Sequence, residues 1–273
     1  MQDELLRHYS APLPKCEALE PAHRFNNYVK AWLICTFMKP GAQVLDLACG
    51  RGGDLKKFRQ NGAGSYFGVD LVPKRIEEAK ARHHSTHCMF AAVFEVADFA
   101  QPLQLLSTYD FVSCQFALHY ACDSRERALH VMSNAALCLA EGGYIVLTFP
   151  DAGEVLKRVG QSLCWAAKHQ SIRFECAPTE GFGCKYDYYH EGTVDHLPEY
   201  LVPVDLLRDV WAELGLEVVL DRKFEDFYCD HDPRLAHRMG VRLPLDAECD
   251  AVVRLYRAVV LQKVERTAKR RRG

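Results

Sequence analysis

The chain has 273 residues, enough for one large domain with a sizeable hydrophobic core. Hydrophobic residues make up 49% and charged residues 26%, a composition typical of a soluble globular protein rather than a disordered or membrane-spanning one. The net charge of −2 by itself gives no indication of a nucleic-acid partner.

The predicted elements begin with a helical segment at residues 23–38, whose apolar run is too short to cross a bilayer. From Gln43 onward, short apolar runs alternate with amphipathic stretches, which predicts a mostly parallel sheet covered by helices. Helices are expected from Pro73, a residue suited to a first helical turn, and from the N-cap Ser124 to a stop at Gly142. Strands are expected to begin near Gln43, Ser65, Phe90, Tyr109 and Gly142, and a last strand is expected over residues 250–264.

The pattern loosens after Pro150, which favours one domain with an insertion between the later strands over two domains. We therefore divide the chain into an N-terminal segment (1–20), a catalytic domain (21–264) and a basic tail (265–273). From Lys263 to Gly273 there are six basic residues and one acidic residue. Such a tail can be a solvated end, a nuclear address or an arm that binds phosphates.

Cysteine usage predicts a reducing compartment. The twelve cysteines are scattered without any C-x-x-C pair, and the charged N-terminus does not resemble a secretory signal. The stretch "HHSTHC", from His83 to Cys88, lacks a second spaced pair of ligands, so we expect no metal there or elsewhere in the catalytic site.

The stretch "VLDLACGRGGDL", from Val44 to Leu55, indicates a buried strand, a tight turn of small residues and a helix. Such a turn brings backbone close to a nucleotide-like ligand, but it occurs in enzymes that move hydride and in enzymes that move methyl groups. Asp70 and Asp98 end the next two predicted strands, at the sheet edge where open α/β sheets bind ligands. Asp70 lies where a carboxylate can accept both ribose hydroxyls.

Five blocks in order decide between these classes: "RFNNYVK" from Arg24, the glycine turn, "SCQFALHY" from Ser113, "GFGCKYD" from Gly181 and "VDHLPEYLV" from Val194. Together they resemble the blocks of the eukaryotic-type mRNA cap guanine-N7 methyltransferases, over nearly the whole chain. The resemblance implies a Rossmann-like class I methyltransferase fold, with a mostly parallel seven-stranded sheet, helices on both faces and a C-terminal insertion. It also implies S-adenosylmethionine as the cofactor and methyl transfer to N7 of the guanosine cap of mRNA.

The resemblance further implies roles for individual residues. Lys30 would pair with the methionine carboxylate of the cofactor, and Asp46 and Ala48 would line its methionine end. Asp70 would hold the ribose and Asp98 the adenine, and Gln115 and Tyr120 would complete the pocket. Ala48 replaces the first glycine of the family's turn.

For the cap, the resemblance implies that Asn26 and Asn27 contact the nucleotide and that Lys57 and Arg82 face its phosphates. His119, Glu199 and Tyr256 would hold the guanine, with Phe25 as a stacking surface beside them. These residues would position the cap, and neither a general base nor a metal is expected, because guanine N7 has a lone pair and no proton to remove.

Other interpretations remain open at this stage. The chain could methylate another small molecule or nucleotide, or bind caps without catalysis, and a nicotinamide dehydrogenase fits less well because some forty residues precede the first strand. Each candidate residue also has an ordinary structural role available, such as a core histidine for His119 or a core aromatic for Tyr256. We expect a nuclear, monomeric protein that binds the 5′ end of capped RNA, with no membrane association, and that can engage other capping enzymes or an activating subunit.

Overall fold

The computed structural model describes residues 2–11 and 14–264, and the basic tail at 265–273 lies outside the described residues. Its centre is a seven-stranded sheet in the order β10-β11-β5-β4-β1-β2-β3. The strands are β1 (Gln43–Leu47), β2 (Ser65–Asp70), β3 (Ala91–Val96), β4 (Tyr109–Gln115), β5 (Leu139–Pro150), β10 (Leu216–Lys223) and β11 (Tyr256–Lys263). The first five are parallel, and β11 runs antiparallel to β5 and to β10. The predicted mostly parallel sheet is confirmed.

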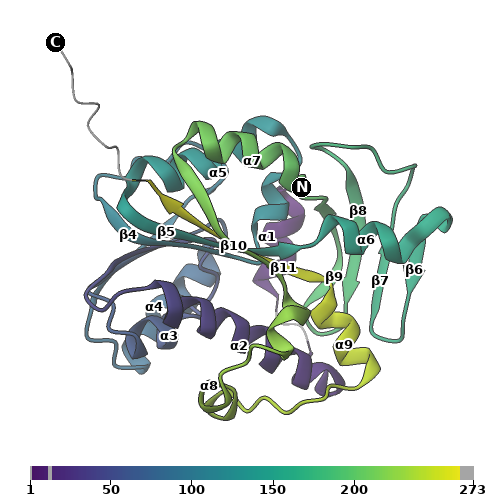
Figure 1. Ribbon diagram of the computed structural model, residues 1–273, viewed down its shortest axis with the longest axis horizontal. Helices are drawn as coiled ribbons and strands as arrows, with labels where there is room; N and C mark the ends of the chain where they lie inside the picture. Colours follow the sequence, from purple (N-terminus) through teal and green to yellow (C-terminus); the bar gives the residue numbers. More distant parts are fainter. Residues whose placement is uncertain (1, 12–13, 265–273) are drawn as a thin grey trace.

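Helices cover both faces of this sheet (Figure 1). The helices α2 (Glu20–Phe37), α3 (Leu55–Gln60) and α4 (Pro73–Ser85) lie on one side, and α5 (Arg125–Cys138) and α7 (Val204–Glu213) lie on the other. The remaining helices are α1 (Gln2–Ser10), α6 (Ala152–Val159), α8 (Pro233–Arg238) and α9 (Ala247–Arg254), and the short 3₁₀ turns are η1 (Glu17–Leu19), η2 (Leu118–Ala121), η3 (Gly160–Ser162) and η4 (Phe224–Tyr228). No helix of the described residues is long and apolar enough to span a bilayer.

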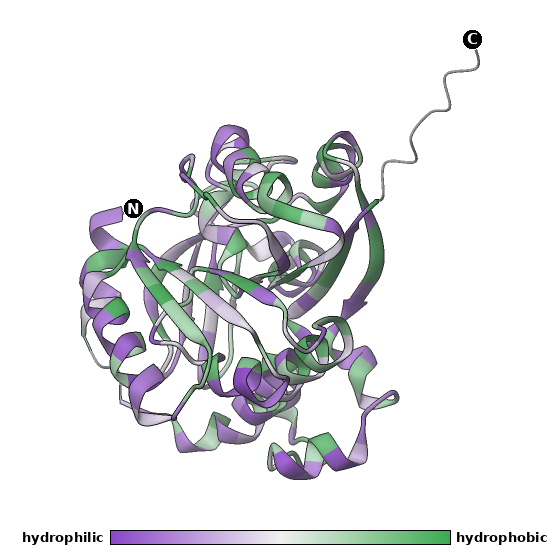
Figure 2. Ribbon diagram, turned by 90° about the vertical axis from the view of Figure 1, so that its left-hand side faces the viewer, coloured by the Kyte–Doolittle hydropathy of each residue, from purple (hydrophilic) through white to green (hydrophobic). Residues whose placement is uncertain are grey.

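The helices alternate hydrophilic and hydrophobic residues along their length, as amphipathic helices on a sheet do (Figure 2). The inner strands β1 and β4 are buried on both faces, with Val44, Leu45, Phe111 and Val112 fully buried. This explains their nearly continuous apolar sequences, since a parallel strand between two helical layers has no solvent-facing side.

The insertion after β5 forms a second, four-stranded antiparallel sheet in the order β6-β7-β8-β9. Its strands are β6 (Cys164–Ala166), β7 (Gln170–Arg173), β8 (Lys185–His190) and β9 (Val194–Tyr200). Aromatic residues that the sequence clusters after Gly181 alternate along β8, with Tyr186 and Tyr188 buried. This sheet stands beside the main one (Figure 1). Side chains of β8 and β9 line the larger of the two cavities of the functional site.

Two predicted boundaries are wrong. Residues 247–254 form α9, so the last strand begins only at Tyr256, whereas the sequence favoured a strand from 250 onward. Asp246 caps this helix by accepting a hydrogen bond from the Cys249 amide, a cap that outweighs the β-branched residues within it. The helix capped by Ser124 ends at Cys138 and not at Gly142, because β5 begins directly at Leu139.

Candidate functional site

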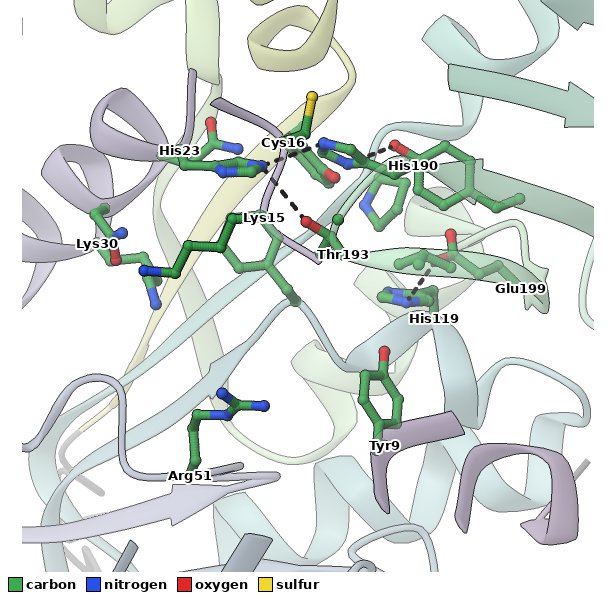
Figure 3. A pocket seen from close by; sticks show the side chains of 18 of the residues that line it. Tyr9, Lys15, Cys16, His23, Lys30, Arg51, His119, His190, Thr193 and Glu199 are labelled. Carbon is green, nitrogen blue, oxygen red and sulfur yellow. Dashed lines mark hydrogen bonds and ion pairs between the residues drawn. The ribbon is translucent and has the colours of Figure 1, made fainter. Parts of the chain in front are cut away.

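Two cavities open at the carboxyl edge of the parallel strands, and they share Tyr9, Arg75, Phe116 and Tyr120 in their walls. The smaller, of about 200 Å³, lies over the ends of β1, β2 and β4. The larger, of about 550 Å³, lies between α2, the 3₁₀ turn η2 and the small sheet, and Figure 3 shows it from close by. Because the walls are shared, a ligand in one cavity lies next to a ligand in the other.

The glycine turn forms the floor of the small cavity. Ala48, Gly50 and Gly52 all have positive φ values, of 58°, 55° and 70°. A Cβ on Gly52 would lie 2.5 Å from Leu55 Cδ1 and would require that side chain to shift, and the positive φ by itself favours glycine at this position. Ala48 takes the left-handed conformation despite its Cβ, at a cost of roughly 1–2 kcal/mol.

Asp70 lines the small cavity and is held by the backbone: its carboxylate accepts hydrogen bonds from the Gly50 amide at 2.7 Å and from the Val72 amide at 2.9 Å. Burial raises the pKa of Asp70, while these two amides oppose the shift. The remaining lone pairs of the carboxylate stay available for a diol.

Asp98, Gln115 and Tyr120 complete this cavity. Asp98 Oδ2 accepts hydrogen bonds from Arg127 and from Gln2 of α1. Gln115 accepts one from Thr148, but its buried Nε2 has no partner in the structure. An unpartnered donor in a cavity wall is costly unless a ligand pairs with it, so the small cavity fits a polar, nucleoside-like group.

Lys30, from α2, lines the large cavity, and its Nζ lies 2.9 Å from Asp54 Oδ2. Lys57 Nζ lies 2.6 Å from the other oxygen of Asp54. Burial would raise the pKa of Asp54, but the two ammonium groups hold it well below its usual range. Asp54 therefore fixes the position of Lys30 in the wall of the large cavity, with its Nζ 5.7 Å from the centroid of the Phe116 ring that both cavities share.

The large cavity has a polar wall made by η2, β8 and β9. His119 Nε2 lies 3.5 Å from Glu199 Oε1 (Figure 3). The other oxygen of Glu199 accepts a hydrogen bond from Tyr186 at 2.8 Å. His119 and Glu199 are each 3% exposed, and neither ring nitrogen of His119 has a hydrogen-bond partner among the residues that the structure describes. Asn26 Oδ1 is likewise buried without a partner in the described part of the chain, while Tyr256 adds a buried phenol whose pKa is raised by burial.

The other side of the large cavity is basic. Lys15, Lys30 and Arg51 reach toward it from the segment before η1, from α2 and from the glycine turn (Figure 3). His23 and His190 lie between the two sides, with their Nε2 atoms 3.3 Å apart. Burial lowers the pKa of His190 to about 3, so this imidazole is neutral at physiological pH.

Most of the residues expected at the site line these cavities. The small cavity has Ala48, Asp70, Asp98, Gln115 and Tyr120 in its wall, and the large one has Asn26, Asn27, Lys30, His119, Tyr120, Glu199 and Tyr256.

Four expected residues line neither cavity. Asp46 is buried behind the turn and accepts a hydrogen bond from Tyr66. Lys57 is buried with its charge on Asp54, which takes it away from the phosphate-facing position expected for it. Arg82 lies in the last turn of α4, outside both cavity walls.

The fourth, Phe25, is a correction. We expected a stacking surface for a base, but the ring is fully buried and packs against Tyr28 and Tyr228, with the Tyr228 centroid at 4.7 Å. The helical period of α2 explains the difference, because it turns Phe25 toward the core while Asn26, Asn27 and Lys30 reach the cavity. Three other aromatic side chains of the described residues, Tyr9, Phe116 and Tyr120, line both cavities instead.

Sequence reasoning missed Tyr9, Arg51, Arg75 and Phe116. Phe116 and Arg51 lie inside quoted blocks and could have been chosen by their position next to expected residues. Tyr9 had no such signal, because α1 precedes every block and only the fold brings it onto the sheet edge.

Two solved structures share this architecture. An S-adenosylmethionine-dependent methyltransferase from Clostridium acetobutylicum matches with a TM-score of 0.55 at 12% identity, over 89% of this chain and 92% of that one. A magnesium protoporphyrin IX methyltransferase from Synechocystis, solved with bound SAH, matches with a TM-score of 0.54 at 18% identity, over 96% and 93%. The fold is that of the class I S-adenosylmethionine-dependent methyltransferases.

Sequence comparison is more specific. A model of the mRNA (guanine-N(7))-methyltransferase domain matches residues 19–268. The mRNA cap guanine-N(7) methyltransferase of Schizosaccharomyces pombe is 32% identical over 222 residues, covering 74% of this chain and 61% of that protein. The rice enzyme named mRNA cap guanine-N(7) methyltransferase 1 is 31% identical over 283 residues, covering 92% and 76%. This chain belongs to the mRNA (guanine-N(7))-methyltransferase family, and it spans about 61% of the length of the S. pombe relative.

Proposed function

We propose that this protein transfers the methyl group of S-adenosylmethionine to N7 of the guanosine cap of mRNA. The observation that carries the proposal is the pair of buried side chains at the wall of the large cavity, His119 and Glu199, beside a cavity suited to a nucleoside. Glu199 is held by Tyr186, and within residues 2–11 and 14–264 His119 has no hydrogen-bond partner of its own.

Guanine matches this wall chemically. Its N1–H and exocyclic amine are two adjacent donors, and a carboxylate is the acceptor that pairs with both. Glu199 retains free lone pairs after accepting from Tyr186, so it can bind that edge of the base. Its negative charge would also stabilise the positive charge that develops on the guanine ring during methylation.

The cofactor is assigned to the small cavity and its junction with the large one. Asp70 would bind the ribose, Asp98 and Gln115 would face the adenine, and Lys30 would pair with the carboxylate of the methionine end. The sulfonium of the bound cofactor supplies an already activated methyl group. The residues of the chain therefore have to align the acceptor nitrogen with that methyl and exclude water, and such positioning can contribute roughly 7–11 kcal/mol.

The basic side of the large cavity suits the phosphate bridge of a cap. Lys15 and Arg51 line it, and they take the part that we first expected of Lys57 and Arg82. Asn26 and Asn27 lie on the same α2 surface as Lys30 and would contact the cap nucleotide. We further propose that a single domain over residues 21–264 performs the reaction and that it acts in mRNA processing in the nucleus.

A methyl-transfer assay on capped RNA, paired with calorimetric binding of S-adenosylhomocysteine, tests the function. Wild-type protein should methylate the cap, and Glu199→Ala should reduce kcat/KM by at least a hundredfold while S-adenosylhomocysteine binding is retained. Glu217→Ala, on the edge strand β10 away from both cavities, is the matched control.

Three outcomes would contradict parts of the proposal. Cofactor binding without methylated cap would favour a different methyl acceptor. Cap binding without any S-adenosylhomocysteine binding would indicate a non-catalytic cap-binding protein. Equal rates for Glu199→Ala and the control would overturn the assignment of the guanine site.

A further inference from the structure

Three segments that are distant in sequence bring a thiol, an imidazole and a carboxylate together at one wall of the large cavity, which Cys16 lines. Cys16 precedes η1, His169 lies in the β6–β7 turn, and Glu191 lies in the β8–β9 turn. Cys16 Sγ is 3.8 Å from His169 Nδ1, which is 2.6 Å from Glu191 Oε2, and the three atoms all lie within 4.8 Å of one another. Cys16 and His169 are buried, whereas Glu191 is partly exposed.

These distances are close to those of a tetrahedral zinc site. With Zn–S near 2.3 Å and Zn–N near 2.0 Å, tetrahedral geometry separates sulfur and nitrogen by about 3.5 Å. The observed 3.8 Å between Cys16 Sγ and His169 Nδ1 needs little change. The carboxylate of Glu191 has to move outward by roughly 0.7 Å to reach tetrahedral separation from that nitrogen, and its partly exposed side chain leaves room for this.

The other nitrogen of His169 faces a second carboxylate. His169 Nε2 lies 3.1 Å from Glu248 Oε2 of α9, although it makes no well-aligned hydrogen bond and His169 is only 8% exposed. A carboxylate on the far nitrogen is the usual support of a metal-bound histidine, because it fixes the tautomer that directs the free lone pair toward the metal. The charges also balance, since a Cys16 thiolate and the Glu191 carboxylate together neutralise one divalent ion.

We propose that Cys16, His169 and Glu191 form a zinc-binding site, with Glu248 supporting His169 and the fourth position open to water. Sulfur, imidazole and carboxylate together form a donor set that zinc accepts readily. Their sequence spacing gives no signal, because the ligands come from three segments that only the fold assembles.

The bound ion would join the segment before η1 to the small sheet and, through Glu248, to α9. Cys16 and the neighbouring Lys15 line the large cavity, together with Gly192 and Thr193 of the β8–β9 turn. The two segments already lie close together, since a Cβ on Gly192 would be 2.7 Å from the Cys16 amide nitrogen. The role is therefore structural: zinc would hold this wall of the large cavity in place.

Direct metal binding tests the site. Full-length protein freed of metal with a chelator is titrated with Zn²⁺ by calorimetry, and with Co²⁺ while the thiolate-to-cobalt charge-transfer absorption is recorded. We expect one ion per chain and a thiolate band. Cys16→Ser and His169→Gln should each weaken binding at least tenfold and Cys16→Ser should abolish the band, whereas Cys35→Ser, which changes an exposed cysteine of α2, should leave both unchanged.

Because Cys16 and His169 are buried, a substitution at either position can prevent folding. Glu191→Gln then tests the site independently, because the side chain of Glu191 is partly exposed. This variant should fold, as judged by circular dichroism, and should bind Zn²⁺ more weakly than wild type. Failure of wild type to bind Zn²⁺, or wild-type binding by Cys16→Ser or Glu191→Gln, would overturn the site. The readout is metal binding and not methyl transfer, so failure of the zinc site and failure of the proposed function are distinguishable.

Discussion

Asp46 shows how a single carboxyl can couple this fold to pH. It lies fully buried in β1, between the hydroxyl of Tyr66, which donates to it at 2.8 Å, and the charge of Asp54. Burial is the main cause that raises the pKa of Asp46 to about 7, and the negative charge of Asp54 adds to the shift. Between about pH 4 and pH 7 the folded protein therefore keeps a proton that the unfolded chain has lost.

We therefore predict that stability falls as pH rises through this range. The contribution of Asp46 is greatest below the unfolded pKa and is lost as pH rises toward the folded pKa of about 7. In Asp46→Asn this contribution is absent. The difference in free energy of unfolding, variant minus wild type, should therefore be about 2–3 kcal/mol more positive at pH 8 than at pH 5. Urea unfolding of the protein without cofactor measures the difference at both pH values.

Asp110→Asn serves as the control, because Asp110 is an exposed carboxyl at the other end of the sheet. Its difference from wild type should be the same at pH 5 and pH 8. A constant difference for Asp46→Asn as well would show that Asp46 titrates normally in the folded state.

At the residue scale, most of the site residues that could be predicted lie inside a sequence block of the family. Asn26, Lys30 and Glu199 lie inside distinctive sequence blocks, and all three line the large cavity. The direction of a side chain is harder to predict, because it depends on helical phase and on pairing. Phe25 is adjacent to Asn26 yet turns into the core. Lys57 is withdrawn from the cavity by Asp54, a residue of the glycine-turn block to which the resemblance assigned no role.

At the scale of elements, the helix α1 lines the site although nothing in the sequence indicated this. Leu5 and Tyr9 line the small cavity, and Tyr9 also lines the large one. The Tyr9 hydroxyl lies 2.7 Å from that of Tyr120, and the Tyr9 carbonyl accepts a hydrogen bond from Arg75 of α4. A nine-residue helix is marginal by itself, so these contacts hold α1 over the cavity.

We predict that Tyr9→Ala weakens binding of S-adenosylhomocysteine about tenfold, equivalent to about 1.4 kcal/mol. The substitution removes a wall shared by both cavities and releases the hydroxyl of Tyr120. Calorimetry measures the affinity, with circular dichroism to establish that the variant is folded. Arg7→Ala, which changes an exposed residue of the same helix, should bind as wild type does. Equal affinities for Tyr9→Ala and Arg7→Ala would mean that α1 makes no contribution to the cavity.

The elements of the main sheet were predictable because apolar strands alternate with amphipathic helices along this part of the sequence. The strand from Ser65 to Asp70 has the bounds that its sequence suggested. The region after Pro150 was not predictable in this way, since short antiparallel strands and capped helices carry weaker signals. The β-branched residues 252–253 favoured a strand, but a helix, α9, forms there because Asp246 caps its N-terminus.

At the scale of the whole molecule, the two sheets share one hydrophobic core. Ile172, Tyr186 and Leu197 of the small sheet belong to the same buried cluster as Leu33 of α2 and Val44 of β1. A second cluster fills the opposite face of the main sheet, so the strands β1, β4 and β5 contribute side chains to both. No break in the core separates residues 164–200 from the rest, although the chain enters and leaves the small sheet only once.

A shared core predicts that the two sheets unfold together. The three tryptophans report on different parts of the fold: Trp32 in α2, Trp165 in β6 and Trp211 in α7, which is buried on the opposite face of the main sheet. Three variants are made, each of which keeps one tryptophan and has the other two changed to phenylalanine. In each variant, the urea midpoint measured by tryptophan fluorescence should equal the midpoint measured by circular dichroism. Coincident curves are the mark of a cooperative two-state transition. A fluorescence transition of Trp165 at clearly lower urea than the circular dichroism of the same variant would instead make the small sheet a separate unfolding unit, and the division into one catalytic domain would then be wrong.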